Sequence, residues 1–119
     1  MSKYYVACDL GPESGRVMLG TLHPDSLTLS EVRRFQNVPV QEKDALQWNI
    51  PQLYQEVLEG LRAIGAYEEA VDSISCDSWS GDYLLFDSDN SLIAPAYHHR
   101  DLRTREGMQK VLSQISREV

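Results

Sequence analysis

Apolar residues form short runs in the first part of the chain, before any helical spacing occurs. Two such runs cover residues 4–8 and 17–22. The first is apolar on both alternating faces, which is typical of a strand buried on both sides. Residues 27–35 alternate with mixed polarity, which predicts a strand near the edge of a sheet. The pattern therefore predicts a meander of three strands.

Helical spacing begins after a polar loop over residues 37–47. Asn49 is placed to cap the helix, Pro51 is tolerated in its first turn, and Gly65 is placed to end it. The stripe consists of Ile50, Leu53, Tyr54, Val57, Leu58, Leu61 and Ile64. A single apolar stripe predicts a helix that packs on the sheet.

A fourth short strand is predicted over residues 71–76, and it ends in Cys76 and Asp77. The first strand ends in the same way, at Cys8 and Asp9. If the two strands are parallel neighbours, both aspartates lie at the carboxyl edge of the sheet, where open α/β sheets bind ligands. The sequence alone does not decide this strand order.

The remaining chain predicts a hairpin and a terminal helix. Residues 83–87 and 92–97 flank a polar turn, which predicts a β-hairpin. His98 and His99 follow, and adjacent residues cannot share one strand face, which disfavours a two-histidine metal site. The helix has an apolar face that needs a partner, made of Met108, Val111, Leu112 and Ile115.

Composition limits the class of protein. The chain has 119 residues, 42% of them hydrophobic, and a net charge of −7. This length suits one domain with a modest core, and the acidic balance argues against nucleic acid or an anionic membrane as partner. The absence of a signal peptide or transmembrane run predicts a cytoplasmic protein. Cys8 and Cys76 are expected to be buried free thiols, rather than a redox pair or half a metal site.

The acidic loop between the first two strands is a candidate ligand site. Gly11 and Gly15 are expected to allow positive φ and to bring amides close to a ligand. Such a loop can bind phosphate oxygens, and Asp9 at the strand end can hold a metal ion. The alternative is an ordinary hairpin turn with a solvated aspartate.

A second candidate lies at residues 78–82, where Trp79 and Asp82 stand close together. Sugars are bound by such mixtures, because a carboxylate accepts from hydroxyls while an aromatic face covers C–H groups. The alternative is a loop in which Trp79 fills a corner of the core.

Three segments resemble motifs of the FGGY carbohydrate kinases, most closely the rhamnulokinases. Residues 9–19 resemble their first phosphate motif, residues 73–83 their sugar-contacting turn, and residues 97–104 their Tyr-Arg-Asp-Ser-Arg-Thr segment. The resemblance implies an actin/hexokinase-like α/β fold, with a ribonuclease H-like half-domain. Its mixed sheet has a three-strand meander, a crossover helix, a fourth parallel strand, a hairpin and a terminal helix. It also implies that residues 1–119 are one partial domain, with the catalytic aspartate and the second lobe lying beyond.

The resemblance implies an ATP-dependent phosphorylation of a keto-sugar such as L-rhamnulose. Asp9 would position Mg²⁺. The phosphate loop would consist of Gly11, Pro12, Glu13, Ser14, Gly15 and Arg16, and the sugar side of Asp77, Trp79, Ser80, Asp82, Arg100 and Asp101. The family prefers small or hydroxyl residues in place of Pro12 and Glu13. A carboxylate about 4 Å from a phosphate oxygen is repelled by roughly 4 kcal/mol at an effective dielectric constant of 20.

Two other functional classes stay open at this point. The chain by itself can be a non-catalytic, self-associating domain without turnover. A two-carboxylate nuclease built on Asp9 and Asp77 is the third, and the acidic balance counts against it. A homodimer is expected, because the terminal helix and an open sheet edge both need a cover.

Overall fold

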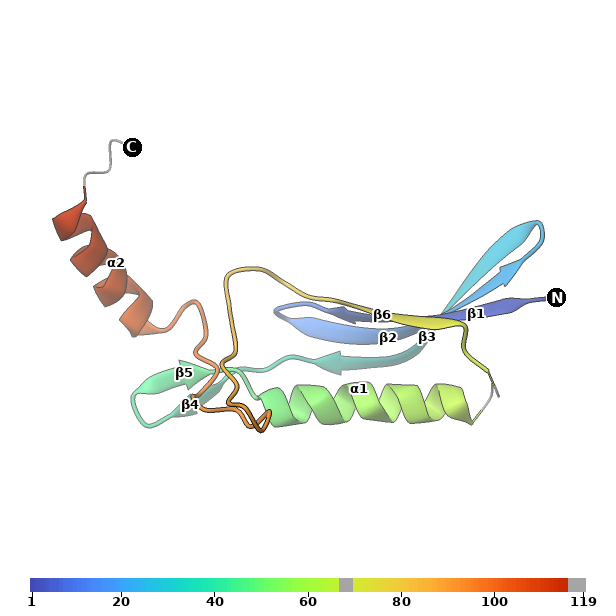
Figure 1. Ribbon diagram of the computed structural model, residues 1–119, viewed down its shortest axis with the longest axis horizontal. Coiled ribbons are helices and arrows are strands. Elements are labelled where there is room, and N and C mark those ends of the chain that lie inside the picture. The colour runs from blue at the N-terminus through green and yellow to red at the C-terminus, as the bar shows by residue number, and fades with distance from the viewer. Residues whose placement is uncertain (67–69, 116–119) are drawn as a thin grey trace. The chain divides into compact units, whose positions relative to one another are not determined.

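The computed structural model describes residues 1–66 and 70–115, which form two compact units. We call residues 1–38 and 49–80 the sheet unit, and residues 39–48 together with those from 81 onward the hairpin unit. The elements follow in the order β1 (Lys3–Leu10), β2 (Ser14–His23), β3 (Ser26–Gln36), β4 (Val40–Glu42), β5 (Ala45–Gln47), α1 (Ile50–Gly65), β6 (Ser73–Asp77) and α2 (Leu102–Gln114) (Figure 1).

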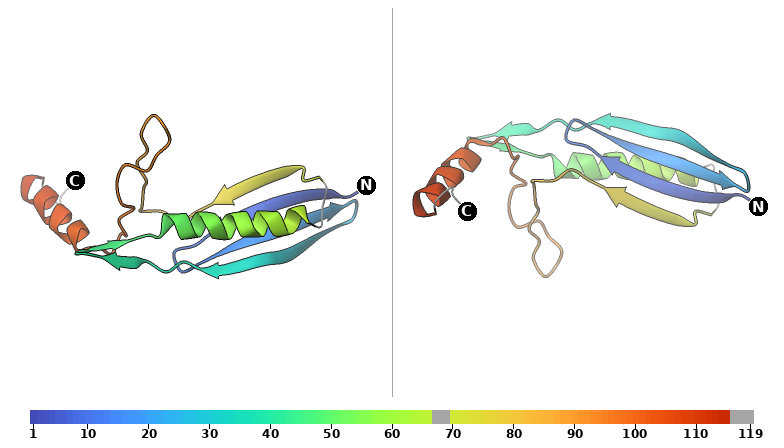
Figure 2. Two further views of the ribbon diagram at one scale, coloured as in Figure 1. Left: turned by 90° about the horizontal axis from the view of Figure 1, so that it is seen from below. Right: turned by 90° about the horizontal axis from the view of Figure 1, so that it is seen from above.

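The sheet unit contains a four-stranded mixed sheet in the order β3-β2-β1-β6 (Figure 2). β1, β2 and β3 pair antiparallel in chain order, and β6 returns beside β1 as a parallel strand. This is the predicted meander, crossover helix and fourth parallel strand. β3 lies at one edge, as its mixed polarity indicated, and β6 lies at the other.

α1 covers one face of this sheet, where it contacts β2 and β3. The core between them consists of Val6, Cys8, Val17, Phe35, Leu53 and Ile64. A Cβ at Gly60 would lie 2.5 Å from Cγ2 of Val17, so the helix can approach the strand this closely only without a side chain there. Asn49 caps α1 as predicted, because its Oδ1 accepts from the Gln52 amide at 3.2 Å.

The hairpin unit contains β4 and β5, an antiparallel pair where a polar loop was predicted. That prediction was wrong because the pair depends on contacts far along the chain. The Trp48 amide donates to the Ala96 carbonyl at 2.7 Å, and the His98 amide donates to the Leu46 carbonyl at 3.0 Å. Such long-range hydrogen bonds leave no periodicity in the local sequence.

The predicted hairpin over residues 83–97 is much shorter than expected. It contains one bridge, between Phe86 and Leu92, flanked by a hydrogen bond from the Ile93 amide to the Leu85 carbonyl at 3.0 Å. Oδ1 of Asp87 accepts from the Asp89 and Ser91 amides at 2.9 Å each, and these bonds hold the turn.

The terminal helix is present as α2, and its predicted apolar face is exposed. Met108 is 53% exposed and Val111 is 54% exposed, and Ile115 lies beyond the last helical residue. Within the described part of the chain, neither α1 nor α2 is long and apolar enough to cross a membrane.

Candidate functional site at the carboxyl edge of the sheet

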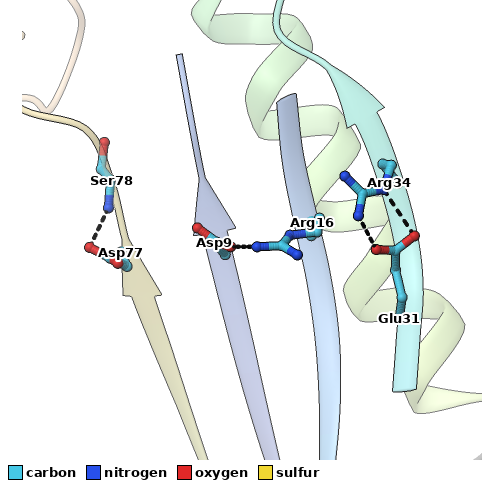
Figure 3. A network of polar contacts seen from close by, with 6 residues as sticks. All are labelled: Asp9, Arg16, Glu31, Arg34, Asp77 and Ser78. Carbon is cyan, nitrogen blue, oxygen red and sulfur yellow. Dashed lines mark hydrogen bonds and ion pairs between the residues drawn. The ribbon is translucent and has the colours of Figure 1, made fainter. Parts of the chain in front are cut away.

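Two carboxylates lie side by side where β1 and β6 end. Asp9 and Asp77 are register partners on these parallel strands, which confirms that they share the carboxyl edge of one sheet (Figure 3). The Asp77 carboxylate accepts from the Ser78 amide at 2.8 Å and thereby fixes the chain as it leaves β6. The edge therefore carries two acidic groups, and carboxylate oxygens are the ligands that hard divalent cations prefer.

Asp9 also pairs across the other neighbouring strand. Arg16 is its register partner on β2, and the guanidinium donates to Oδ2 of Asp9. Both side chains are about two-fifths exposed, at 42% for Asp9 and 40% for Arg16. An ion pair this exposed contributes at most about 1 kcal/mol, so a bound cation or anion can compete for either partner at little cost.

A second ion pair lies next to this one on β3. Arg34 donates to both carboxylate oxygens of Glu31, at 3.1 and 2.6 Å (Figure 3). The hydrogen bond from Arg34 lowers the pKa of Glu31, so the pair stays ionised at neutral pH. It offers a comparison for Asp9 and Arg16, because it has the same chemistry on the next strand, and Arg34 also interacts with the charge of Asp9.

The loop between β1 and β2 is a tight turn without the positive-φ glycines expected of a phosphate-binding loop. Among the described glycines, only Gly81 has positive φ (+96°), so the expectation of positive φ at Gly11 and Gly15 was wrong. The Gly11 amide donates to the Ser14 carbonyl at 2.9 Å, and a Cβ at Gly11 would lie 2.8 Å from that oxygen. Gly11 is therefore needed for close approach, and Pro12 has no amide hydrogen to offer.

Asn37 holds this loop from the end of β3. Its backbone amide donates to the Glu13 carbonyl at 2.9 Å, and its Nδ2 donates to the Gly11 carbonyl at 3.0 Å. The residue is 4% exposed, and its Oδ1 has no hydrogen-bond partner among the described residues. Sequence reasoning missed Asn37, because an asparagine after a strand looks like any loop residue.

The hairpin unit has a polar cluster of its own. Asp82 and His99 are joined by a hydrogen bond of 2.9 Å, and the Arg103 guanidinium lies 3.4 Å from the centre of the Tyr97 ring. These residues line a pocket of ≈ 360 Å³, together with Tyr83. A carboxylate, donors and aromatic faces around one pocket suit a polar ligand with apolar C–H faces.

Asp101 stabilises the backbone beside this pocket. Its Oδ2 accepts from the Leu46 amide at 2.6 Å, and its Oδ1 accepts from the Arg103 amide at the start of α2 at 3.0 Å. These two bonds, the Leu46 one first, lower the pKa of the carboxyl group. Asp101 thus connects β5 to the beginning of α2.

Comparison with curated proteins shows that this chain is similar to one part of several sugar kinases. It is 43% identical over 118 residues to the rhamnulokinase of Pectobacterium carotovorum subsp. carotovorum (strain PC1), covering 98% of the chain and 24% of the relative. It is 36% identical over 118 residues to the rhamnulokinase of Oceanobacillus iheyensis, covering 99% of the chain and 25% of the relative. Over nearly its whole length, the chain is therefore similar to rhamnulokinases, which belong to the FGGY carbohydrate kinases. The chain spans about a quarter of the length of these relatives.

Solved structures agree with the fold of this rhamnulokinase-like chain. A gluconate kinase from Lactobacillus acidophilus matches it with a TM-score of 0.74 at 14% identity, over 96% of this chain and 23% of that one. A xylulose kinase from the same species matches with a TM-score of 0.72 at 14% identity, over 94% and 23%. No protein-family model matches the chain. The structural matches confirm the actin-like α/β fold predicted from the sequence.

The predicted site residues divide between the two units. The sheet unit brings Asp9, Arg16 and Asp77 to one edge, and Trp79 packs against the core there. Ser80 is exposed at the end of the same unit. In the hairpin unit, Asp82 lines the pocket. Arg100 is exposed, and its backbone amide donates to Nδ1 of His98 at 2.9 Å. Asp101 accepts the two backbone hydrogen bonds described above.

One sequence prediction about the thiols needs correction. Cys8 is buried in the core as expected, but Cys76 is exposed, and both are free. The reason is that β6 is an edge strand, whereas α1 contacts β2 and β3. The apolar run that ends in Cys76 correctly predicted a strand, but the predicted burial of Cys76 was wrong.

Proposed function

We propose that this chain is the part of an ATP-dependent sugar kinase that contributes the phosphate loop and part of the sugar site. The acceptor is a keto-sugar such as L-rhamnulose. The identity of 43% to a rhamnulokinase over 98% of the chain carries this proposal. The arrangement of Asp9, Arg16 and Asp77 at one sheet edge supports it, because phosphoryl transfer depends on positioning and charge neutralisation.

Asp9 is the residue proposed to serve Mg²⁺, which supplies charge neutralisation at the phosphates when bound. Its carboxylate fits that task, because it is part-exposed and its ion pair with Arg16 is weak. Arg16 then becomes available for phosphate oxygens, which a guanidinium binds with two parallel donors. Gly11, Pro12, Glu13, Ser14 and Gly15 complete the proposed phosphate loop.

Glu13 limits how tightly this loop holds a nucleotide. Its side chain is exposed, while its carbonyl is held by the Asn37 amide at 2.9 Å. The backbone position is therefore fixed, and the carboxylate is free to turn toward solvent and away from phosphate oxygens. We propose that nucleotide binding is retained and weaker than it would be with a hydroxyl residue at this position.

The sugar side is proposed to use Asp77, Trp79, Ser80, Asp82, Arg100 and Asp101. Asp82 is the best supported of these, because it lines a pocket and pairs with His99 at 2.9 Å. Asp101 is the least supported, since both of its oxygens already accept backbone hydrogen bonds. A sugar hydroxyl would have to share one of those oxygens.

A segment exchange tests the proposed function. The matching quarter of the 43%-identical rhamnulokinase is replaced by this chain, and the purified hybrid is assayed for L-rhamnulose-dependent ADP formation. The proposal expects sugar-dependent turnover. A hybrid that melts cooperatively like its parent but turns over no sugar would contradict it.

The 119-residue chain alone is a separate case. We propose that it transfers no phosphoryl group at a measurable rate, because the resemblance implies that the catalytic aspartate lies outside these residues, in relatives that are about four times longer. Losing general base catalysis alone lowers a rate by about 10²–10⁴-fold. A coupled assay with rhamnulose checks this. Sugar-dependent ADP formation near ordinary kinase rates, with contaminating kinases excluded, would refute it.

We also propose that residues 1–119 are one partial kinase domain in the cytoplasm and that the isolated chain forms a homodimer. The exposure of Met108 and Val111 on α2 and the unpaired edge of β6 support self-association. Light scattering should give twice the chain mass of 13.5 kDa at micromolar concentration. A clean monomer mass would defeat the dimer proposal and leave the kinase proposal untouched.

A further inference from the structure

The two thiols of the chain are placed opposite each other on neighbouring strands. Cys8 on β1 and Cys76 on β6 are register partners in the parallel pair. Residues paired in this way project to the same face of a sheet, because side chains alternate in step along both strands. Cys8 belongs to the core on the face that α1 covers, so Cys76 projects to that face as well.

The strand spacing brings the pair within reach of a covalent bond. Neighbouring strands lie about 4.7–4.9 Å apart, and disulfides join cysteines whose Cα atoms are about 4.4–6.8 Å apart. β6 is an edge strand with a neighbour on one side only. It can therefore adjust to the geometry of a disulfide more easily than a central strand.

The two thiols differ in their surroundings. Cys8 is 2% exposed and lies in the core of the sheet unit. Cys76 is exposed on the edge strand. An oxidant in solution thus reaches Cys76 first, and Cys8 is the buried thiol directly beside it.

We propose that Cys8 and Cys76 form a reversible intramolecular disulfide when the chain meets a two-electron oxidant of the peroxide or disulfide class. With a peroxide, the Cys76 thiolate attacks one oxygen, the O–O bond breaks, and a sulfenic acid and water are formed. The Cys8 thiolate then attacks the Cys76 sulfur, and the sulfenic oxygen leaves as a second water. Two thiols and one hydrogen peroxide give one disulfide and two waters.

A disulfide at this place acts on the residues that follow. Asp9 and Asp77 come directly after the two cysteines and are register partners themselves. Joining the strands one residue earlier fixes the distance between these carboxylates. The bond also ties the edge strand β6 covalently to β1 in the interior of the sheet.

The test uses the full chain, first reduced and then freed of reductant. Hydrogen peroxide is added in steps, and the products are examined by intact mass and by peptide mapping without reductant. The proposal expects the mass of a single chain less about 2 Da, the mass of two hydrogens, with the Cys8 and Cys76 peptides joined. Dithiothreitol should restore both free thiols.

A matched variant moves the exposed thiol by one residue. Cys76→Ser combined with Ser75→Cys keeps one thiol on β6 but pairs it with Ala7 and places it on the opposite face. This variant should form no internal bond, and Cys8→Ala in the original chain should form none either. If either variant folds poorly, hydrogen exchange of the unsubstituted chain gives a second measure, since oxidation should slow exchange along β6.

Three results would overturn the proposal. One is a Cys76 that stops at a sulfenic or sulfinic acid while Cys8 stays reduced. Another is a disulfide between the Cys76 residues of two chains as the main product. The third is equal internal bond formation in the variant that carries the thiol at position 75, because the link would then not depend on register.

Discussion

The sheet unit packs through apolar side chains, whereas the hairpin unit is connected through hydrogen bonds and stacked rings. In the sheet unit, Val17 and Ile64 are almost completely buried between β2 and α1. In the hairpin unit, Trp48 stacks on His98 with ring centres 4.1 Å apart. Apolar burial is insensitive to pH, but contacts of imidazole and carboxylate groups are not. The two units should therefore respond differently to truncation and to pH.

Truncating the apolar core should have the largest effect on stability. Ile64→Ala removes a side chain that is 1% exposed, and we expect a loss of about 2–5 kcal/mol in the free energy of unfolding. Tyr54→Ala, at a position of α1 that is 61% exposed, is the matched control, with an expected change within about 0.5 kcal/mol. Urea unfolding measures both. Equal losses would mean that the sheet unit has no dominant apolar core.

Removing the carboxylate that connects β5 to α2 should have an intermediate effect. Asp101→Ala deletes a helix cap and the acceptor for the Leu46 amide, at an expected cost of about 0.5–2 kcal/mol. Faster hydrogen exchange at the Leu46 and Arg103 amides, together with an unchanged exchange rate at Val6, would place the loss of stability in the hairpin unit. Asp44→Ala in the exposed turn beside β5 is the control. Unchanged exchange at both amides would show that the Asp101 carboxylate does not stabilise β5 or the start of α2.

Lowering the pH through about 6.5 should have the smallest effect, and we expect it to act on the hairpin unit through His98. Burial first, and His99 second, lower the pKa of His98 from its ordinary value of 6.5, while Asp82 and Asp101 oppose this shift and Arg100 adds to it. The unfolded chain then binds more protons, so the His98 contribution to stability is present above about pH 6.5 and is lost as the pH falls below it.

The neutral form of His98 is also required by geometry, because Nδ1 accepts from the Arg100 amide at 2.9 Å. Proton NMR titration of the imidazole checks the shift, and His98→Gln should flatten the dependence of stability on pH below about 6.5. A His98 pKa at or above its ordinary value would contradict this interpretation.

The comparison of the units also explains what the sequence could predict. The sheet strands and the amphipathic helix were predicted from apolar runs, because these patterns are local. The order of the strands was not decided by these patterns and was implied only by the resemblance to the FGGY kinases. The meeting of Asp9 with Asp77 was predicted on the condition that β1 and β6 are parallel neighbours, which the structure confirms. β4 and β5 could not be predicted, since they depend on hydrogen bonds to Ala96 and His98, which are remote in the sequence.

Errors in the sequence interpretation also had physical causes. Cys76 was expected to be buried because its strand is apolar, but an edge strand away from the helix stays exposed. Gly11 was expected to have positive φ, but its role is to allow the Ser14 carbonyl to approach. Site residues that directly follow a strand could be predicted. Asn37 could not, because its side chain holds a loop that is remote from it in the sequence.

The proposed role of Asp9 in phosphoryl transfer is tested in the active segment-exchange hybrid. There, Asp9→Asn is compared with Glu31→Gln, which alters the neighbouring ion pair on β3. We expect Asp9→Asn to lower kcat on the order of 10²–10³-fold, the loss typical of one preorganised electrostatic contact, and Glu31→Gln to leave kcat nearly unchanged. A hybrid in which both variants turn over L-rhamnulose equally fast would contradict the claim.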